Sequence, residues 1–431
     1  MLSLIGLIGG LLLLIVLTIR GMNLLIAAPL CALVVALTGG LDLLSLSDTA
    51  FVNQYMGGFA GFVQSWFLMF LLGSLFGKVM EDTGCAQSVS HYLVEKLGAK
   101  YAALSIVLSC AILTYGGVSL FVVAFSVYPM ALALFREGNL PRRFIPATMA
   151  FGSVTFTMTS AGSPEIQNWI PIKYLGTDHL AAWEVSLVVA LFMAAFGYWW
   201  LTFMIKRALA RGESFDARAH DPKEREKSLP HPAKSLLPLL VVLIVSFIFH
   251  DSLKQNALIL ALLAGSITAW ITNLKFVHNL NHALGEGTTG ALLAIGNTAA
   301  VVGFGSVAKA SPAFAVAVET MTSIPGNELL GAALAVSAIA GLTGSASGGQ
   351  AIALPVLAPH YIDAGVNPEQ LHRVVAISSG ALDSLPHNGY VVTTIRAICG
   401  ETHKAAYGPM AALTVITPLL GLALALAIFI I

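Results

Sequence analysis

The sequence predicts an all-α polytopic membrane protein made of two inverted-topology repeats, on the basis of three observations. Its 431 residues are 57% hydrophobic and only 10% charged, whereas soluble globular proteins are about one quarter charged. Many apolar runs reach the roughly 20 helical residues that cross a hydrocarbon layer about 30 Å thick. The order of these runs, and of the breaks within them, occurs twice along the chain.

A charged segment separates two apolar halves. The stretch 206–234 holds 13 of the 44 charged residues and three prolines, a composition typical of a solvated linker. We therefore expect a first repeat over 1–207, a cytoplasmic linker over 208–235 and a second repeat over 236–431.

Each half is expected to contain five membrane crossings and one re-entrant hairpin. Two apolar stretches, 101–135 and 328–363, have small residues at their centres, which predicts paired half-length helices. Two short segments of mixed polarity, 85–97 and 312–324, are expected to lie along the membrane surface. The crossings are placed near 2–19, 23–40, 59–77, 142–176 and 183–205, and near 236–250, 256–272, 287–308, 368–399 and 408–431.

Matching features of the two halves recur at a common offset. The offset from Gly117 to Gly344 equals that from Pro141 to Pro368, about 227 positions. Because five crossings is an odd number, the second repeat should run upside down relative to the first. With the linker in the cytoplasm, 18 of the 22 Lys and Arg residues lie on the cytoplasmic side, as the positive-inside rule requires. The four left outside are Lys173, Lys254, Lys309 and Arg373.

The charge pattern also predicts the location of the protein and excludes some partners. We expect a bacterial-type inner (cytoplasmic) membrane with both termini on the outer side, and a first helix that is retained because no basic leader or cleavage site precedes it. A net charge of zero argues against nucleic acid as a partner. The four scattered cysteines, Cys31, Cys85, Cys110 and Cys399, are expected to be buried, without disulfides or zinc.

Four segments leave the helical pattern at membrane depth. Unwound backbone cannot face lipid, so these breaks must be buried in protein or line an aqueous cavity. A half-helix that begins there directs free N–H groups and a partial positive charge toward a ligand. Small residues that let helices pack closely are the alternative explanation. The four breaks are TYGGVS (114–119), TSAGSPEIQN (159–168), TGSASGGQ (343–350) and LDSLPHNG (382–389), and together they predict the binding site of a secondary transporter.

Three ionisable residues at these breaks are candidates for ion coupling. Each costs at least about 2.5 kcal/mol at the centre of a bilayer, so each is a functional candidate. Glu165 follows a Ser-Pro pair at the start of a half-helix, where simple helix capping is the alternative. Asp383 and His387 lie four residues apart, a spacing that suits either a proton relay or a neutral structural pair.

No Lys or Arg occurs within the four breaks. An anionic substrate would then be held by helix N-termini and by hydroxyl and amide groups, an arrangement that suits a small hydroxy-monocarboxylate. No cofactor is expected. The candidate substrate-binding residues are Gly116, Gly117, Ser119, Ser160, Gly162, Ser163, Asn168, Thr343, Gly344, Ser345, Ser347, Gly348, Gln350, Ser384 and Asn388.

The breaks and their flanking helices resemble the gluconate permease (GntP) family of the wider ion transporter superfamily. The likeness lies in GGVSLFVVAFSVYPMALALFREGNLPRRFIPATMAFGS and SAGSPEIQNWIPIKYLGT in the first half, and in SASGGQAIALPVLAP and ALDSLPHNGYVVTTI in the second. Gluconate-type members carry a His- and Pro-rich segment where this chain has SAGSPEIQN, and this form is more similar to the branch labelled 3-hydroxybutyrate permease.

The resemblance implies a proton-coupled symporter for 3-hydroxybutyrate or a gluconate-like sugar acid. It also implies a transport domain of hairpins and broken helices that moves, in the elevator manner, against a homodimeric scaffold. Its site would lie at 115–119, 160–168, 343–350 and 383–388. Sodium coupling is the nearest alternative, because unwound carbonyls beside hydroxyl and amide groups also suit Na⁺. A passive channel, and an intramembrane enzyme, for which the sequence offers only the pair Asp383 and His387, are the other classes considered.

Overall fold

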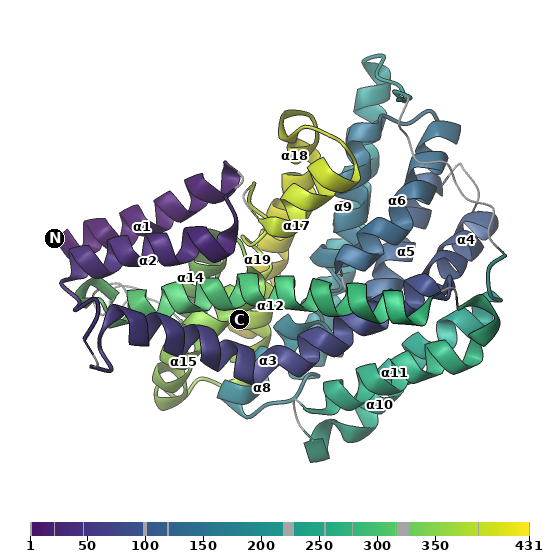
Figure 1. The fold of residues 1–431 in the computed structure, drawn as a ribbon. Coiled ribbons are helices and arrows are strands. Elements are labelled where there is room, and N and C mark those ends of the chain that lie inside the picture. Colours follow the sequence, from purple (N-terminus) through teal and green to yellow (C-terminus); the bar gives the residue numbers. More distant parts are fainter. Residues whose placement is uncertain are drawn as a thin grey trace.

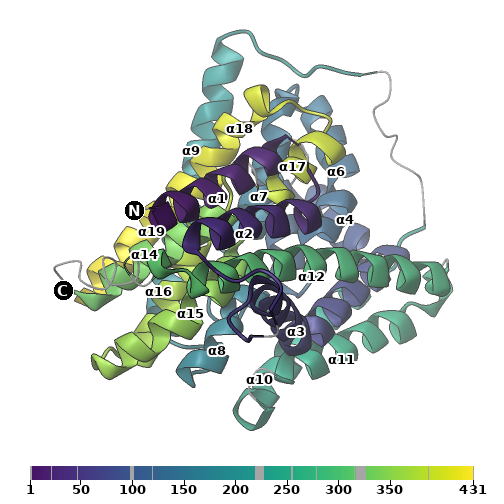
Figure 2. The same cartoon turned by 60° about the vertical axis from the view of Figure 1, so that its left-hand side comes forward.

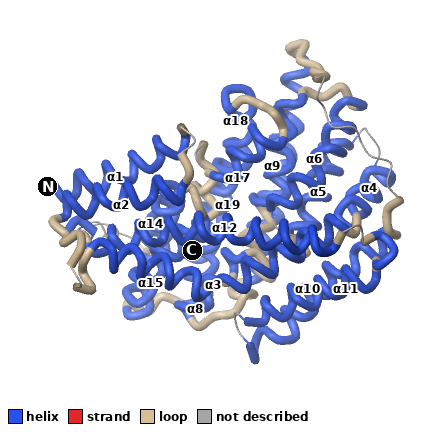
Figure 3. Tube along the Cα trace, viewed as in Figure 1, coloured by secondary structure: helices blue, strands red, loops and turns tan. Residues whose placement is uncertain are grey.

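A computed structural model describes residues 2–20, 22–45, 47–97, 101–118, 120–218, 228–253, 256–277, 279–314, 316, 327–386 and 388–430. Within these ranges the chain consists of helices joined by loops, and no strand is present (Figure 3). The predicted all-α fold is therefore confirmed.

Two long helices run side by side through the centre of the molecule (Figure 1). They are α3 (Phe51–Asp82) and α12 (Leu280–Ala310), and each is long and apolar enough to cross a membrane. A buried hydrogen bond from the Tyr55 hydroxyl to the Ala300 carbonyl, 3.1 Å long, joins them. Both extend beyond the predicted spans 59–77 and 287–308, because backbone hydrogen bonding continues the helix past the apolar window that marks the bilayer.

Two helical hairpins pack against this central pair, each on the helix that comes from the other half of the chain (Figures 1 and 2). In the first half, α1 (Leu2–Ile19) pairs with α2 (Leu24–Gly39), and α2 packs on α12. In the second half, α10 (Pro232–Leu253) pairs with α11 (Ala257–Thr272), and α11 packs on α3. Each half therefore contributes the hairpin that covers the central helix of the other half.

Each of the two interrupted stretches forms a pair of packed helices rather than one continuous span, and each helix has 14 to 18 residues. The first pair is α5 (Ala102–Tyr115) with α6 (Leu120–Glu137), and the second is α14 (Glu328–Thr343) with α15 (Ala346–Asp363). One pair follows the central helix α3 in the chain, and the other follows the central helix α12.

Each of these helix pairs turns at a glycine in the left-handed region. The backbone φ is +92° at Gly117 and +60° at Gly344, and an L side chain rarely adopts such values. In the second pair, the Ser345 side chain then accepts a hydrogen bond from the Gly348 N–H at 3.1 Å and starts α15. The glycine-rich break thus ends one helix and begins another within a few residues.

Two further segments are broken helices, also as predicted. The first begins with α7 (Ile145–Ala150) and a π-helical turn, continues as a non-helical stretch and a short 3-10 turn (Ile166–Asn168), and resumes at α8 (Ile170–Leu175). The second consists of α16 (Pro368–Ser379), a non-helical stretch, and α17 (Gly389–Val392), which leads into another π-helical turn.

The remaining helices complete the bundle. The predicted segment 85–97 is helix α4 (Cys85–Leu97), whereas most of 312–324 lies outside the described residues. Helix α9 (Trp183–Ala210) packs on α19 (Thr417–Ile430). The predicted crossing 408–431 starts earlier, with α18 (His403–Ala411), because the Thr402 side chain caps the Ala405 N–H. All four cysteines are buried free thiols.

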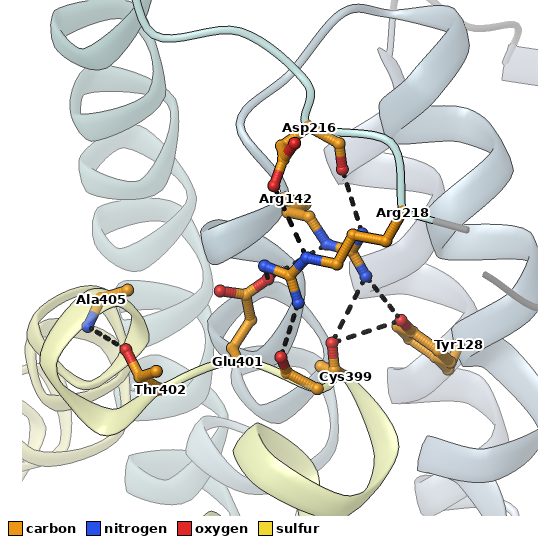
Figure 4. Close-up of polar contacts among 9 residues, drawn as sticks. Tyr128, Arg142, Asp216, Arg218, Cys399, Glu401, Thr402 and Ala405 are labelled. Carbon is orange, nitrogen blue, oxygen red and sulfur yellow. Dashed lines mark hydrogen bonds and ion pairs between the residues drawn. The ribbon is translucent and has the colours of Figure 1, made fainter. Parts of the chain in front are cut away.

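The beginning of the charged linker is docked onto the helix ends rather than extended into solvent (Figure 4). The Arg218 guanidinium lies 2.8 Å from the Glu401 carboxylate, and Arg142 forms an ion pair with the same carboxylate at 3.1 Å. Arg142 also donates to the Asp216 carbonyl at 3.0 Å. The linker residues 219–227 lie outside the described residues.

Candidate functional site

Within each repeat, the hairpin tip contacts the broken helix. In the first repeat, the Tyr115 hydroxyl donates a hydrogen bond to the Ala161 carbonyl at 2.6 Å. In the second repeat, the Asn388 side-chain amide donates to the Gly344 carbonyl at 2.9 Å. The predicted breaks therefore form two pairs, one in each repeat.

Contacts between the repeats bring the two pairs together. The side-chain amide of Gln350 donates to the Gln167 carbonyl and to the Ser379 hydroxyl, each at 2.9 Å. A Cβ built on Gly380 would lie 3.0 Å from the Thr159 methyl group, so the two broken helices cross in contact. All four breaks thus converge in one region, although they are separated by more than half of the chain.

A buried arginine of the second half holds the break 159–168. Arg373, in α16, is fully buried and donates from Nη1 to the Thr159 carbonyl at 2.7 Å and to Asn168 Oδ1 at 2.9 Å. Its Nε and Nη2 both donate to the Ala181 carbonyl, at 3.1 and 2.9 Å. The four breaks contain no Lys or Arg, but the break 159–168 is in direct contact with the guanidinium of Arg373.

The structure adds to the sequence interpretation of Arg373. That interpretation counted this residue only as one of four basic charges on the outer side, and the structure shows its side chain buried inside the helical bundle. The available signal was its position within the predicted crossing 368–399, ahead of the apolar run VVAI. Its burial depends on acceptors about two hundred residues away in sequence, which no local pattern reveals.

Glu165 does not act as a helix cap. It precedes the short helical turn Ile166–Asn168, but its side chain makes no capping hydrogen bond. The side chain is partly exposed, and no hydrogen bond or ion pair joins its carboxylate to any residue that the structure describes. The alternative explanation by capping is therefore not supported.

Asp383 is buried, with an exposed fraction of 6%. Its Oδ1 accepts a hydrogen bond from the neighbouring Ser384 hydroxyl at 3.0 Å. The Ser384 carbonyl in turn accepts from the Tyr407 hydroxyl at 3.2 Å, which fixes this break against α18. The proposed partner His387 lies outside the described residues.

Several predicted substrate-binding side chains are occupied in holding the backbone. The Asn168 amide donates to the carbonyls of Ser163 and His179, and its oxygen accepts from Arg373. The hydroxyls of Ser160 and Thr343 donate to carbonyls of their own segments. Ser119 lies outside the described residues.

Polar groups without partners remain near the meeting point of the repeats. The side-chain oxygens of Gln350 and Gln167 are buried and accept no hydrogen bond from the described residues. The orientation of Gln350 is fixed because its amide nitrogen donates to a backbone carbonyl, which can only accept. Ser347 lies in the first turn of the 18-residue helix α15, which begins at the break 343–350, and its hydroxyl is 3.5 Å from the Ser345 hydroxyl. These groups can accept or donate bonds to a small polar ligand.

A cavity of about 860 Å³ lies beside the first-repeat breaks. It reaches Gly116 and Ser160 from the predicted set, and its walls come from α5, α9 and α10. Most of its lining is aliphatic or aromatic, including Leu239, Leu243 and Phe247. Such a lining does not match a carboxylate, so the polar groups at the meeting of the breaks are the better candidate site.

Comparison with known proteins finds similar permeases and transporters. The model of the GntP family permeases matches residues 1–251. The chain is 38% identical to the uncharacterized transporter YxjC of Bacillus subtilis, over 92% of both chains. It is 30% identical to the high-affinity gluconate transporter of Escherichia coli, over 30% of this chain and 28% of that protein.

Two solved transporter structures share the fold at low sequence identity. MtrF of Neisseria gonorrhoeae, described with a class of antimetabolite efflux pumps, has a TM-score of 0.55 at 14% identity and covers 94% of this chain and 93% of its own. YdaH of Alcanivorax borkumensis has a TM-score of 0.50 at 17% identity and covers 99% and 98%. The relatives are permeases and transporters rather than enzymes. The chain belongs to the GntP permease family and is a multi-pass membrane transporter.

Proposed function

We propose that this transporter is a symporter that imports a small hydroxy-monocarboxylate, such as 3-hydroxybutyrate or a gluconate-like sugar acid, together with protons. The observation that carries the proposal is the convergence of all four helix breaks, two from each repeat, through direct contacts. A site built between two repeats can open to either side of the membrane when one part moves against the other. The similarity to the gluconate transporter of Escherichia coli supports an organic anion as the substrate.

The proposed substrate site consists of the break residues 115–119, 160–168, 343–350 and 383–388. The N-terminus of α15 would attract the carboxylate, because its first N–H groups and the helix dipole favour an anion. Hydroxyl groups of the substrate would meet Ser347 and the unpaired side-chain oxygens of Gln167 and Gln350. A multiply charged anion would be held less well by this set.

Glu165, Asp383 and His387 are the proposed ion-coupling residues. Among the described residues, Glu165 has no hydrogen-bond or ion-pair partner, and the buried Asp383 carboxylate has no ion pair and accepts a hydrogen bond from the adjacent Ser384 hydroxyl. A carboxylate inside a membrane protein whose negative charge is balanced by no cation is suited to binding and releasing a proton during transport.

We further propose an elevator-type movement in a bacterial inner membrane. The hairpins α5–α6 and α14–α15, re-entrant in the bilayer, would move with the broken helices, and α3 and α12 would belong to a homodimeric scaffold. Inverted repeats of 1–207 and 236–431 would place the linker 208–235 in the cytoplasm and both termini outside. The basic residues concentrated in that linker support this orientation.

Uptake into proteoliposomes tests the proposal. Labelled 3-hydroxybutyrate and gluconate should accumulate when the outside is acidic, and an uncoupler should abolish accumulation while saturable counterflow persists. Accumulation that changes neither with the pH gradient nor with the uncoupler would exclude proton coupling. Unitary currents without counterflow would identify a passive channel instead of a carrier.

Sodium coupling is the second candidate, and one observation favours it. The buried side-chain oxygens of Gln167 and Gln350 have no donor among the described residues, and uncharged oxygens are suitable ligands for Na⁺. The same vesicles, with an inward sodium gradient at equal pH on both sides, separate the two ions. Accumulation driven by sodium alone would replace the proton in the proposal.

A further inference from the structure

Arg373 carries a buried charge that forms no ion pair with a carboxylate of the described chain. Its guanidinium is fully buried and bound by two backbone carbonyls and the amide oxygen of Asn168, all uncharged acceptors. The Asp178 carboxylate, in the nearby loop, attracts the guanidinium from beyond ion-pair distance and itself accepts a hydrogen bond from the Leu180 N–H. A buried cation without a direct ion-pair partner is costly, and one is retained here inside the membrane protein.

Arg142 offers a direct comparison from the other repeat (Figure 4). It precedes the first broken helix and is buried against the loop that follows the second one, where Nη2 is 3.5 Å from the Cys399 carbonyl. Arg373 makes the reciprocal contact, from the second broken helix to the Ala181 carbonyl beyond the first. Arg142, however, has the Glu401 carboxylate at 3.1 Å. Each half thus contributes a buried arginine that donates hydrogen bonds to the other half. Of these two arginines, only Arg142 forms an ion pair with a carboxylate.

We propose that Arg373 is a positioning residue that fixes the break 159–168 and supplies the positive charge that makes the substrate site select anions. Its donors hold the Thr159 carbonyl and Asn168, which bracket the break 159–168. The guanidinium stands behind this backbone and acts on the ligand through its electric field. In a buried site this field is screened less than in water, so binding of one carboxylate offsets the cost of the buried cation. The inference rests on the proposed function, because it concerns the charge of the same substrate.

Two substitutions separate charge from geometry. Arg373→Gln removes the charge, whereas Arg373→Lys keeps it but cannot reproduce the paired bonds to Ala181. The exposed Arg211, at the end of α9, provides the matched control Arg211→Gln. Binding of the potassium salts of 3-hydroxybutyrate and gluconate, and of their uncharged amides, is measured by calorimetry on the purified full-length protein in detergent.

Wild type and Arg211→Gln should bind each carboxylate at least about tenfold more tightly than its amide, which corresponds to about 1.4 kcal/mol. Arg373→Gln should lose this preference, and Arg373→Lys should keep it while binding both forms more weakly. If Arg373→Gln keeps the wild-type ratio, the inference is overturned and the proposed function stands. If Arg373→Gln does not fold, a loss of the ratio in Arg373→Lys overturns the inference. Wild type that binds neither form of either compound overturns both.

Discussion

The side-chain amide of Gln350 donates a hydrogen bond to the backbone carbonyl of Gln167 at 2.9 Å. This bond joins the hairpin of the second repeat to the broken helix of the first. Gln350 is fully buried, and its amide also reaches Ser379 in α16. One side chain therefore links α15 and the following helix α16 to a break that lies 183 residues away in the sequence.

Replacing Gln350 with Ala should weaken both the fold and transport. The change leaves the Gln167 carbonyl without its donor, which costs about 1–3 kcal/mol for a buried group. We expect a lower midpoint of thermal unfolding in detergent and a large fall in uptake. Gln64→Ala, on the exposed face of α3, is the control and should change neither. Unchanged unfolding and uptake in Gln350→Ala would show that this contact is dispensable.

Replacing Asp383 with Asn should abolish accumulation against a gradient and leave exchange intact. Asn has nearly the same shape and can still accept from Ser384, but it cannot take up a proton at neutral pH. Uptake and counterflow in the same proteoliposomes measure the two activities. Asp363→Asn, at the exposed end of α15, is the control. A variant that still concentrates substrate would remove Asp383 from ion coupling.

Replacing Glu165 with Gln tests the second acid in the same assay. The native carboxylate has no partner among the described residues, so the folded state loses little when its charge is removed. We expect wild-type thermal stability together with a changed dependence of uptake on external pH. A helix-capping role would produce the opposite pattern, with lower stability and an unchanged pH profile.

Replacing Glu401 with Gln should destabilise the end of the molecule that carries the docked linker. The Glu401 carboxylate is 5% exposed and balances both Arg142 and Arg218 (Figure 4). Removing one partner of a buried ion pair costs about 3–5 kcal/mol, because the remaining charge stays buried. Thermal unfolding of this variant is compared with Glu369→Gln, an exposed substitution in α16. Equal midpoints would contradict the assigned role of the ion pair.

The contact of Glu213 with Arg143 should depend on pH. Hydrogen bonds from the Arg143 guanidinium hold the pKa of Glu213 below its ordinary value of 4.5. A lowered pKa means that the contact stabilises the docked linker above the unfolded pKa, and that this contribution disappears as the pH falls through the folded pKa. The pair is partly exposed, so the effect is about 0.2–1 kcal/mol. Limited proteolysis of the linker at pH 7 and pH 4 should differ in wild type and not in Glu213→Gln.

Local chemistry made much of the fold predictable. Hydrophobic runs located the crossings, and glycine marked the hairpin turns because Gly117 and Gly344 adopt positive φ values. The bounds of the helices were less predictable, because caps such as Thr402 and continued hydrogen bonding, rather than hydrophobicity, decide where a helix starts and ends.

The predicted breaks lie together in the structure, but not all of their side chains are free to bind a ligand. The four breaks meet as a binding site would require, but Asn168 is engaged by Arg373 and by two carbonyls rather than left free. The side-chain pairings could not be anticipated, because each joins residues from different segments. Whether Arg373 is a surface charge or a buried one depends on the acceptors Thr159 and Ala181, which are near only after folding.

The sequence by itself determined that this is a helical membrane protein and where its helices break. These properties depend on hydrophobicity and on backbone preferences, both of which act over a few neighbouring residues. Only the tertiary structure decided that the breaks share one region, that Gln350 joins the repeats, and that one arginine is paired with an acid while the other is not. Burial and charge compensation depend on contacts across the whole chain, so they are set by packing rather than by local sequence.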